Sequence, residues 1–305
     1  MGADIRKVLA LVNPRSGVSG AAADAMRIVA RHWDRSGIDL SFKFSHSESD
    51  GRAKVRRAIE SGIDTVLVVG GDGMVNTIGG ELVGTDVALG VVPTGSGNGF
   101  ARHFDIPLQP DDAAEALVKA RRQSIDVGMA NGRSFFVTCS MAWDATIVRT
   151  FEKSPVRGVF PYVLAGVYEF IDYQPQPFTV ILDGEPERVF EDPLVFTVAN
   201  LTQYGGGAQI APSACPDDGF LELVFIARRH APALLPMLPR LFTGTFDRTP
   251  YVKTFRLSRM KVRRRQPAPI QMDGELLEAA AEIEIEVRPR ALSVLIPESA
   301  RVDAA

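Results

Sequence analysis

The clearest chemistry in the sequence lies in the segment VLVVGGDGMVN, where the turn Gly70-Gly71-Asp72-Gly73 directly follows an apolar run. Glycines let the backbone approach an anion closely, and the free N–H groups at the start of a following helix attract phosphate. Asp72 adds a carboxylate at the place where metal-bound phosphates would lie. A Gly-rich connection can also be an ordinary turn, so this motif by itself predicts only phosphate binding beside a carboxylate.

Two more polar turns follow apolar runs in the same way. GVVPTGSGNGF places Gly95, Ser96 and Asn98 after one run, and LVNPRSG places Asn13, Ser16 and Gly17 after another. Asn-Pro ends the preceding strand, because the residue before a proline is restricted. In open α/β sheets ligands bind at the carboxyl ends of the strands. The three turns therefore predict a phosphate site at one edge of a sheet.

The first 125 residues alternate strand and helix patterns. Strands are expected at Lys7–Asn13, Leu40–Ser45, Asp64–Gly70 and Val87–Pro93, and helices at Ala21–Ser36, Ser49–Ser61 and Pro110–Arg122. Near-continuous apolar, β-branched strands are typical of a parallel sheet that is covered by helices on both faces. We expect an α/β domain over residues 1–125.

After Ser124 strand patterns dominate, separated by Gly, Pro and Asp. They lie at Ser134–Ser140, Phe178–Asp183, Pro193–Asn200, Phe220–Ala227, Thr254–Arg263, Glu282–Arg288 and Ala291–Ile296, with helices expected at Pro161–Tyr173 and Ala231–Phe242. This order predicts a mainly antiparallel β-sandwich over residues 126–290, with the boundary near Ile125-Asp126. Residues 291–305 are free to pack back on the first domain.

The three turns together resemble those of the diacylglycerol kinase catalytic-domain family, which includes bacterial lipid kinases and sphingosine kinases. The family motifs NPxSG, GGDGxxN and PxGSxN match at Asn13–Gly17, Gly70–Asn76 and Pro93–Asn98. The resemblance covers nearly the whole chain. It implies an α/β domain like that of NAD kinases and phosphofructokinases, followed by the β-sandwich. It also implies that ATP and Mg²⁺ are used to phosphorylate a hydroxyl group of a diacylglycerol-like or sphingoid lipid, bound in a cleft between the domains.

The same resemblance assigns roles to individual residues. The implied nucleotide-binding positions are Asn13, Ser16, Gly17, Ser45, Gly70, Gly71, Asp72, Gly73, Asn76, Gly95, Ser96 and Asn98. In QMDGEL, Glu275 matches the family's general base, and Asp72 would orient the metal or the attacking hydroxyl. A second Asp-Gly-Glu occurs at Asp183–Glu185, where we expect a hairpin turn. The order of the motifs selects the later copy.

A third set of residues concerns the metal and the acceptor. ACPDDGFLELVF resembles the family's magnesium loop, with Asp218 as the side-chain ligand and backbone carbonyls near Cys215 and Phe220. Hard oxygen ligands on a tight loop suit Mg²⁺, although an ordinary Asp-Gly turn is the alternative. Asp126 matches an acidic position at the family's domain junction, beside the acceptor cleft.

The sequence also departs from the family pattern. Met74, Thr77 and Gly99 stand where the family usually has Thr, Glu and Asp. These differences leave the acceptor lipid open and motivate the second of two alternative functions. One is a kinase of a soluble acceptor such as NAD, and the other is a catalytically inactive homologue that only binds lipid or nucleotide.

Composition narrows the setting. The net charge of −3 does not favour nucleic acid as a partner, and Cys139 and Cys215 are too few and too far apart for a disulfide framework. We see neither a signal-peptide pattern nor an apolar run long enough to cross a bilayer. We expect a cytoplasmic protein with peripheral membrane contact, and a homodimer is left open. Candidate contact surfaces are the basic run Arg259–Arg265 and the Arg-flanked apolar stretch Arg228–Phe242.

Overall fold

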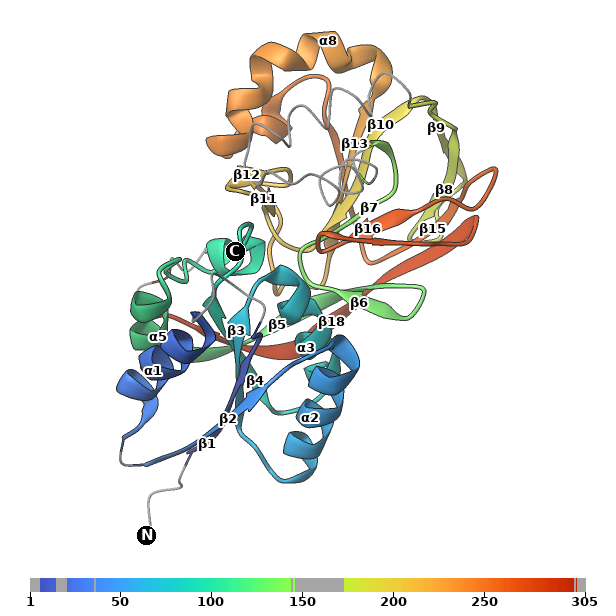
Figure 1. The fold of residues 1–305 in the computed structure, drawn as a ribbon. Coiled ribbons are helices and arrows are strands. Elements are labelled where there is room, and N and C mark those ends of the chain that lie inside the picture. The colour runs from blue at the N-terminus through green and yellow to red at the C-terminus, as the bar shows by residue number, and fades with distance from the viewer. Residues whose placement is uncertain are drawn as a thin grey trace. The chain divides into compact units, whose positions relative to one another are not determined.

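The computed structural model describes residues 6–14, 21–35, 37–143, 145, 173–298 and 300. The chain divides into two compact units, which are Met1–Ile125 with Arg290–Ala305, and Asp126–Pro289. Two strands, β5 (Arg121–Ala130) and β18 (Glu282–Ile296), run from one unit into the other (Figure 1).

The first unit is built on a parallel sheet. Its strands follow the order β2 (Ile38–Phe44), β1 (Arg6–Val12), β3 (Thr65–Gly70) and β4 (Ala88–Pro93), and the end of β18 pairs with β4. Every one of these pairings is parallel. All residues of β3 and β4 are buried, as their β-branched, apolar composition predicts. The expected parallel sheet is confirmed.

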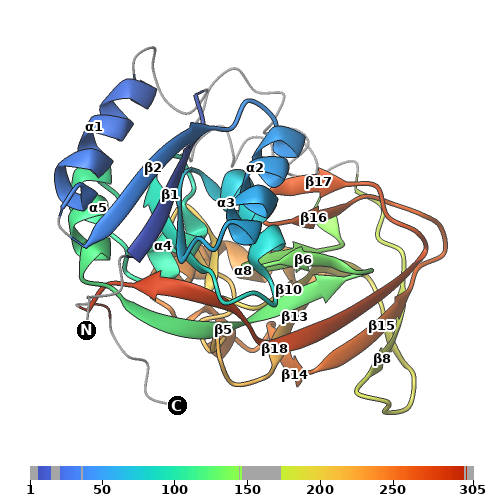
Figure 2. The same cartoon turned by 90° about the horizontal axis from the view of Figure 1, so that it is seen from below.

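Helices cover both faces of this sheet. Figure 2 shows α1 (Ala21–Trp33) and α5 (Pro110–Val118) on one face, and α2 (Glu48–Glu60) and α3 (Asp72–Leu82) on the other. The buried Trp33 indole N–H donates to the Ala114 carbonyl at 2.9 Å and so joins α1 to α5.

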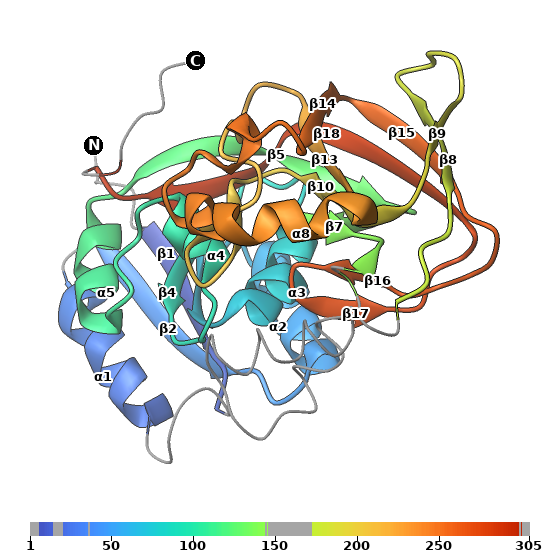
Figure 3. The ribbon, with the colours of Figure 1, turned by 90° about the horizontal axis from the view of Figure 1, so that it is seen from above.

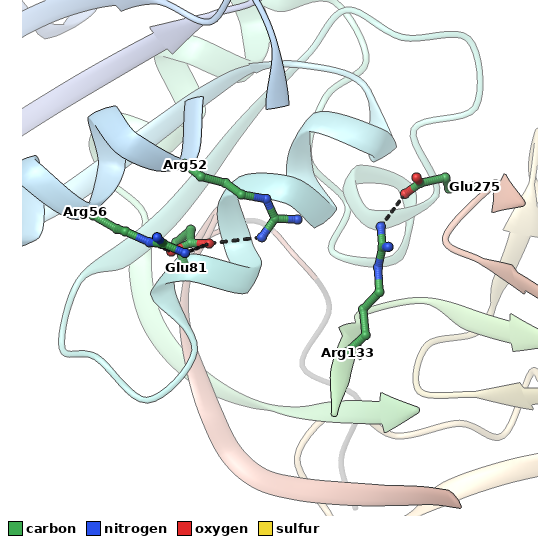
Figure 4. A network of polar contacts seen from close by, with 5 residues as sticks. All are labelled: Arg52, Arg56, Glu81, Arg133 and Glu275. Atoms are coloured by element: carbon green, nitrogen blue, oxygen red, sulfur yellow. Dashed lines mark hydrogen bonds and ion pairs between the residues drawn. The ribbon is translucent and has the colours of Figure 1, made fainter. Parts of the chain in front are cut away.

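On the opposite face, charged side chains join the other two helices. Glu81 of α3 accepts hydrogen bonds from Arg52 at 3.0 Å and from Arg56 at 2.5 and 3.1 Å, both on α2 (Figure 4). These contacts hold in place the helix whose first turn carries Asp72.

The second unit is an antiparallel β-sandwich. One sheet has the order β14 (Lys253–Leu257), β13 (Leu221–Ala227), β10 (Pro193–Ala199), β7 (Thr138–Ser140), β16 (Ile270–Met272) and β17 (Glu275–Leu277). The opposing layer contains the first half of β18, β15 (Arg259–Arg263), β8 (Phe178–Leu182) and β9 (Arg188–Phe190), and β6 (Arg133–Phe135) pairs with β5. A small hairpin, β11 (Gln203–Gly205) and β12 (Ala208–Gln209), lies apart from both sheets. The core is shared between the two layers. Phe178 of β8 packs edge-on against Phe196 of β10, and their ring centroids are 5.0 Å apart. The predicted sandwich is confirmed.

Two expected strands are in fact broken. Residues 134–140 form β6 and β7, because the Asp273 carboxylate accepts the N–H groups of Phe136 and Val137 between them. Residues 254–263 form β14 and β15 in different sheets, because Asp183 accepts the Ser258 N–H at the break. In each case a buried or turn carboxylate takes backbone donors away from the sheet ladder.

Two other boundaries also differ from expectation. The two strands expected over 282–296 are a single β18, and Pro289 lies between the part paired with β15 and the part paired with β4. The helix expected at Pro110–Arg122 ends at Val118, and the residues from Arg121 onward belong to β5.

The expected helix Ala231–Phe242 is also modified. Helix α8 covers only Ala231–Leu234 and continues as the 3₁₀ segment η2, Leu235–Phe242. Pro236 and Pro239 lack the N–H groups that an α-helix needs there. The short 3₁₀ turns η1 (Arg228–His230) and η3 (Phe246–Arg248) flank it. Apart from Tyr173, the expected helix at 161–173 lies outside the described residues. Within the described part of the chain, none of the helices has the length and apolar character required to span a bilayer.

Candidate active site

The loops that follow four neighbouring parallel strands are tied to one another in a row. Three of these loops donate a backbone N–H to the carbonyl oxygen of a neighbouring strand. The hydrogen bonds run from Ser45 to Val12 at 2.8 Å, from Asn13 to Val69 at 3.2 Å, and from Thr94 to Gly70 at 3.0 Å. The structure therefore brings the described parts of the three predicted turns, and Ser45, to one edge of the sheet. Ser16 and Gly17 lie outside the described residues.

The two Gly-rich turns touch through their backbones. A β-carbon placed on Gly95 would lie 2.7 Å from the Gly71 Cα atom, and one placed on Gly71 would lie 3.1 Å from the Gly95 Cα atom. A β-carbon on Gly73 would meet nothing within 4 Å. Two of the predicted phosphate-binding glycines are thus required by this close approach, which forms a continuous backbone surface from both turns.

Asp72 joins the same two turns by hydrogen bonds. It is the first residue of α3, and its carboxylate accepts the N–H groups of Gly99 at 3.1 Å and Phe100 at 3.3 Å. These donors begin the short helix α4 (Gly99–His103). Burial raises the pKa of Asp72, and the N–H donors of residues 98–100 act against that increase. These contacts give Asp72 a structural role, whereas its role toward metal or hydroxyl stays a prediction.

Some of the remaining polar side chains at this edge form hydrogen bonds within the loops, and others are exposed to solvent. Asn98 adopts φ 52°, donates from Nδ2 to the Gly95 carbonyl at 2.8 Å and accepts the Gly95 N–H at 3.2 Å. Its amide therefore closes the loop that carries Ser96, whose side chain is exposed. Asn76 is buried on α3, and the Ser45 hydroxyl donates to the Ser47 carbonyl at 3.1 Å. Of these four side chains, Ser96 is the most open to a ligand.

In the second unit, Glu275 stands at the exit of a tight hairpin. Asp273 and Gly274 have φ values of 49° and 89° and connect β16 to β17. The Asp273 carboxylate is held rigidly by the N–H groups of residues 136, 137 and 138 at 2.7, 2.7 and 3.0 Å. Glu275 accepts a hydrogen bond from Arg133 Nη2 at 2.7 Å, and both side chains are about two-fifths exposed (38% and 40%) (Figure 4).

The other Asp-Gly-Glu copy has the same local shape. Asp183 and Gly184 also have positive φ values, 47° and 79°, in the turn between β8 and β9, so the predicted hairpin is confirmed. The two copies differ in the partner of the glutamate. Glu185 pairs with Arg188 in its own hairpin, whereas Glu275 pairs with a residue 142 positions away. Sequence reasoning missed Arg133, because no local pattern marks so distant a partner.

The predicted metal loop is held by an arginine and a buried aspartate. Asp218 Oδ2 accepts from Arg256 at 2.6 Å, and the Arg256 guanidinium lies 4.1 Å from the ring centroid of Phe220. The fully buried Asp126 accepts the Gly219 N–H at 2.6 Å, and its own N–H donates to Pro216 at 2.6 Å. Asp126, expected beside the acceptor cleft, therefore braces the loop that carries Asp218.

The donor set of this loop suits magnesium. The Cys215 thiol is directed to Asp217 Oδ1 at 3.4 Å, so the candidate ligands are the Asp218 carboxylate and the carbonyl oxygens of Cys215 and Phe220. All three are hard oxygen donors of the kind that Mg²⁺ and Ca²⁺ take. Among the described residues no group of three or more His, Cys, Asp and Glu side chains could hold a metal. A metal here would depend on backbone carbonyls and water.

An α/β unit with joined phosphate-type turns, followed by an antiparallel sandwich that carries an acidic hairpin, defines a two-domain kinase architecture. The family described as "Diacylglycerol kinase catalytic domain" matches residues 7–130, and "YegS C-terminal NAD kinase beta sandwich-like domain" matches residues 138–296.

Relatives cover nearly the whole chain. A "Diacylglycerol kinase" of Mycobacterium tuberculosis is 32% identical over 304 residues, covering 96% of each chain. "Probable lipid kinase YegS-like" of Pectobacterium atrosepticum is 30% identical, covering 91% of this chain and 93% of that one. A crystal structure of a diacylglycerol kinase from Bacillus anthracis shares the fold, with a TM-score of 0.72, 19% identity and coverage of 97% and 98%. The chain belongs to the diacylglycerol kinase family and is an enzyme of the kinase class.

Proposed function

We propose that this protein transfers the γ-phosphate of ATP to a hydroxyl group of a membrane lipid, diacylglycerol-like or sphingoid. The observation that carries the proposal is the joined pair of Gly-rich turns at Gly71 and Gly95, an anion-binding backbone surface. Membership of the diacylglycerol kinase family and the names of its relatives support the lipid as acceptor.

Phosphoryl transfer depends mainly on positioning and on neutralisation of charge. In this proposal the N–H groups of the two turns and the exposed Ser96 hydroxyl bind the phosphates. Asp72 keeps the turns together through its hydrogen bonds to Gly99 and Phe100. Glu275 accepts the proton of the attacking hydroxyl, and Arg133 orients the glutamate. Mg²⁺ bound at the Asp218 loop would supply positive charge and rigidity there.

The departures from the family pattern are compatible with activity. Gly99 contributes its backbone N–H to Asp72, a contact that does not depend on the missing side chain. Met74 packs close to Gly70, and Thr77 is buried within α3. These substitutions therefore fit the fold, and the hydrogen bond that joins the two turns through Asp72 is kept.

The direct test is incubation of the purified protein with labelled ATP and a total lipid extract in mixed micelles, with products identified by mass. A Glu275→Gln variant controls for contaminating kinases. We expect a phosphorylated lipid that depends on Glu275 and on Mg²⁺. Label transferred to NAD or a sugar phosphate instead, or to no compound at all, would select one of the two alternatives.

This activity requires the enzyme to meet a bilayer on the side where ATP is present. We therefore place it at the cytoplasmic surface of a membrane as a peripheral protein.

A further inference from the structure

The segment after β13 covers the outer face of the six-stranded sheet in the second unit. Leu234 and Phe246 are buried in a cluster with Val224 and Ile226 of the sheet, and Leu241 packs against it. Figure 3 shows α8 and its continuation in front of β10 and β13. Leu234 precedes η2 and Leu241 lies near its end, so both ends of η2 are held against the sheet.

The outward side of η2 is apolar, and we call it the η2 ridge. It consists of Leu235, Pro236, Leu238, Pro239 and Phe242, all exposed. In a 3₁₀ helix residues three apart align, so Leu235 and Leu238 form one row and the two prolines form, with Phe242, the next. Leu241, which continues the first row, packs against the core cluster and is not part of the ridge. The exposed fractions of Leu235, Leu238 and Phe242 are 67%, 45% and 57%. Among the described residues these are three of the seven exposed large hydrophobics.

Basic residues lie within and on either side of the ridge segment in the sequence. Residues 228–248 contain four arginines, Arg228, Arg229, Arg240 and Arg248, and one acid, Asp247, so the segment carries a formal charge of 4 − 1 = +3. The whole chain carries −3. Arg229, Arg240 and Arg248 are exposed. An apolar surface with a basic margin is complementary to an anionic lipid surface.

The other candidate from the sequence, the run Arg259–Arg265, lacks this property. Along β15 each outward basic residue faces a glutamate of β18, with Arg259–Glu286 at 3.0 Å, Lys261–Glu284 at 2.6 Å and Arg263–Glu282 at 3.7 Å. Arg264 is buried and donates to backbone carbonyls, including those of residues 268 and 280. The positive charge of the run Arg259–Arg265 is thus largely balanced, and the run forms one face of a strand that is covered by salt bridges.

We propose that the η2 ridge docks the protein on anionic bilayers, with the apolar side chains in the interfacial layer and the arginines among the headgroups. The proposal rests on the proposed function in one respect, that the acceptor is a lipid. A second copy of the chain is a poorer occupant, because a two-fold contact through the ridge would bring the same basic margins together. The ridge is pre-formed by two prolines, so docking orders little additional chain.

The test compares flotation with vesicles of neutral phosphatidylcholine and with vesicles that also contain phosphatidylglycerol. The ridge variant is Leu235→Ser with Leu238→Ser and Phe242→Ser, and the charge variant is Arg229→Glu with Arg240→Glu. Val189→Ser is the matched control, since Val189 is 57% exposed on β9 in the same unit. We expect the ridge variant to lose at least about tenfold in vesicle partitioning, the charge variant to lose its preference for the anionic vesicles, and the control to bind as the wild type does.

Two further measurements keep the outcomes distinct. Light scattering gives the mass of each variant in solution, and phosphorylation of a short-chain, monomeric lipid reports catalysis without a bilayer. Flotation of the ridge variant at the wild-type level overturns the proposal. A dimer that becomes monomeric in the ridge variant, with vesicle binding unchanged, also overturns it and makes the ridge a self-interface. Loss of flotation by a protein that phosphorylates no lipid supports docking while rejecting the lipid-kinase function.

Discussion

Gly71 and Gly95 stand so close together that a β-carbon on Gly95 would approach the Cα atom of Gly71 to 2.7 Å. Each glycine belongs to a different phosphate-type turn, after a different strand. The approach makes one anion-binding surface from two loops. Asp72 stabilises this arrangement, because its carboxylate accepts the N–H groups of Gly99 and Phe100 at the start of α4.

Gly95→Ala should separate the two turns. The new methyl group would lie 2.7 Å from the Gly71 Cα atom and 2.9 Å from Oδ1 of the Asn98 side chain, so the loops must shift. Overpacking of this kind costs about 1–3 kcal/mol, which urea unfolding would measure. ATP binding, followed by calorimetry, should weaken as well. Gly73→Ala is the matched control for stability, because a β-carbon there would meet nothing within 4 Å. Equal stability of the two variants would contradict the close-approach argument.

Glu275→Gln should abolish transfer while ATP binding persists. Loss of a general base lowers the rate by about 10²–10⁴-fold, measured as kcat with the lipid substrate. The chain contains its own control, Glu185→Gln, which alters the same motif after a turn whose Asp and Gly also have positive φ values. If both variants turn over at the wild-type rate, Glu275 is not the base.

Arg133→Met should lower kcat and leave the KM for ATP unchanged. Arg133 is a positioning residue that acts through the Glu275 carboxylate at 2.7 Å, so Arg133→Lys should restore part of the rate. Arg188→Met removes the corresponding partner of Glu185 and should have no effect on turnover. An equal loss in the Met and Lys variants, accompanied by unfolding, would show a purely structural role.

Arg256→Leu should strengthen magnesium binding at the Asp218 loop, because the guanidinium occupies the carboxylate that a metal would use. An ion pair of this exposure contributes about 0–1 kcal/mol, so the gain in affinity should stay within about fivefold. The affinity for magnesium is measured from the rise of Tm as MgCl₂ is added. Asp218→Asn should abolish that rise, and Lys253→Leu, on the same strand, should leave it unchanged. A rise of Tm that persists in Asp218→Asn would place the metal elsewhere.

Asp72 should give folding stability a pH dependence that Asp72→Asn lacks. Its folded pKa lies above the usual 3.8, because burial disfavours the carboxylate. As pH rises above 3.8 the unfolded chain releases this proton first, so the free energy of unfolding falls until the folded group also ionises. Urea unfolding from pH 4 to 7 should therefore show the wild type losing stability relative to the Asn variant. The opposite slope would mean that the N–H donors outweigh burial.

Much of the fold could be predicted from local patterns in the sequence. Continuous apolar strands, helical spacing and Asp-Gly turns express backbone preferences within a few residues, and these identified the parallel sheet, the sandwich and the hairpin at Asp183–Glu185. The Gly-rich turns could be placed at one edge, because repeated β-α-β connection makes the strands parallel and their carboxyl ends then lie on the same side of the sheet.

Only the tertiary structure decided how polar side chains are paired. Asp273 and Asp183 divide two expected strands, Arg133 reaches Glu275 over 142 residues, and β18 neutralises the basic run of β15. Such contacts depend on strand register and on which distant segments become neighbours, and no local spacing encodes either. The sequence by itself therefore determined the elements and the class of chemistry, whereas the register of distant strands decided which charged groups are paired within each unit and which face of η2 is exposed.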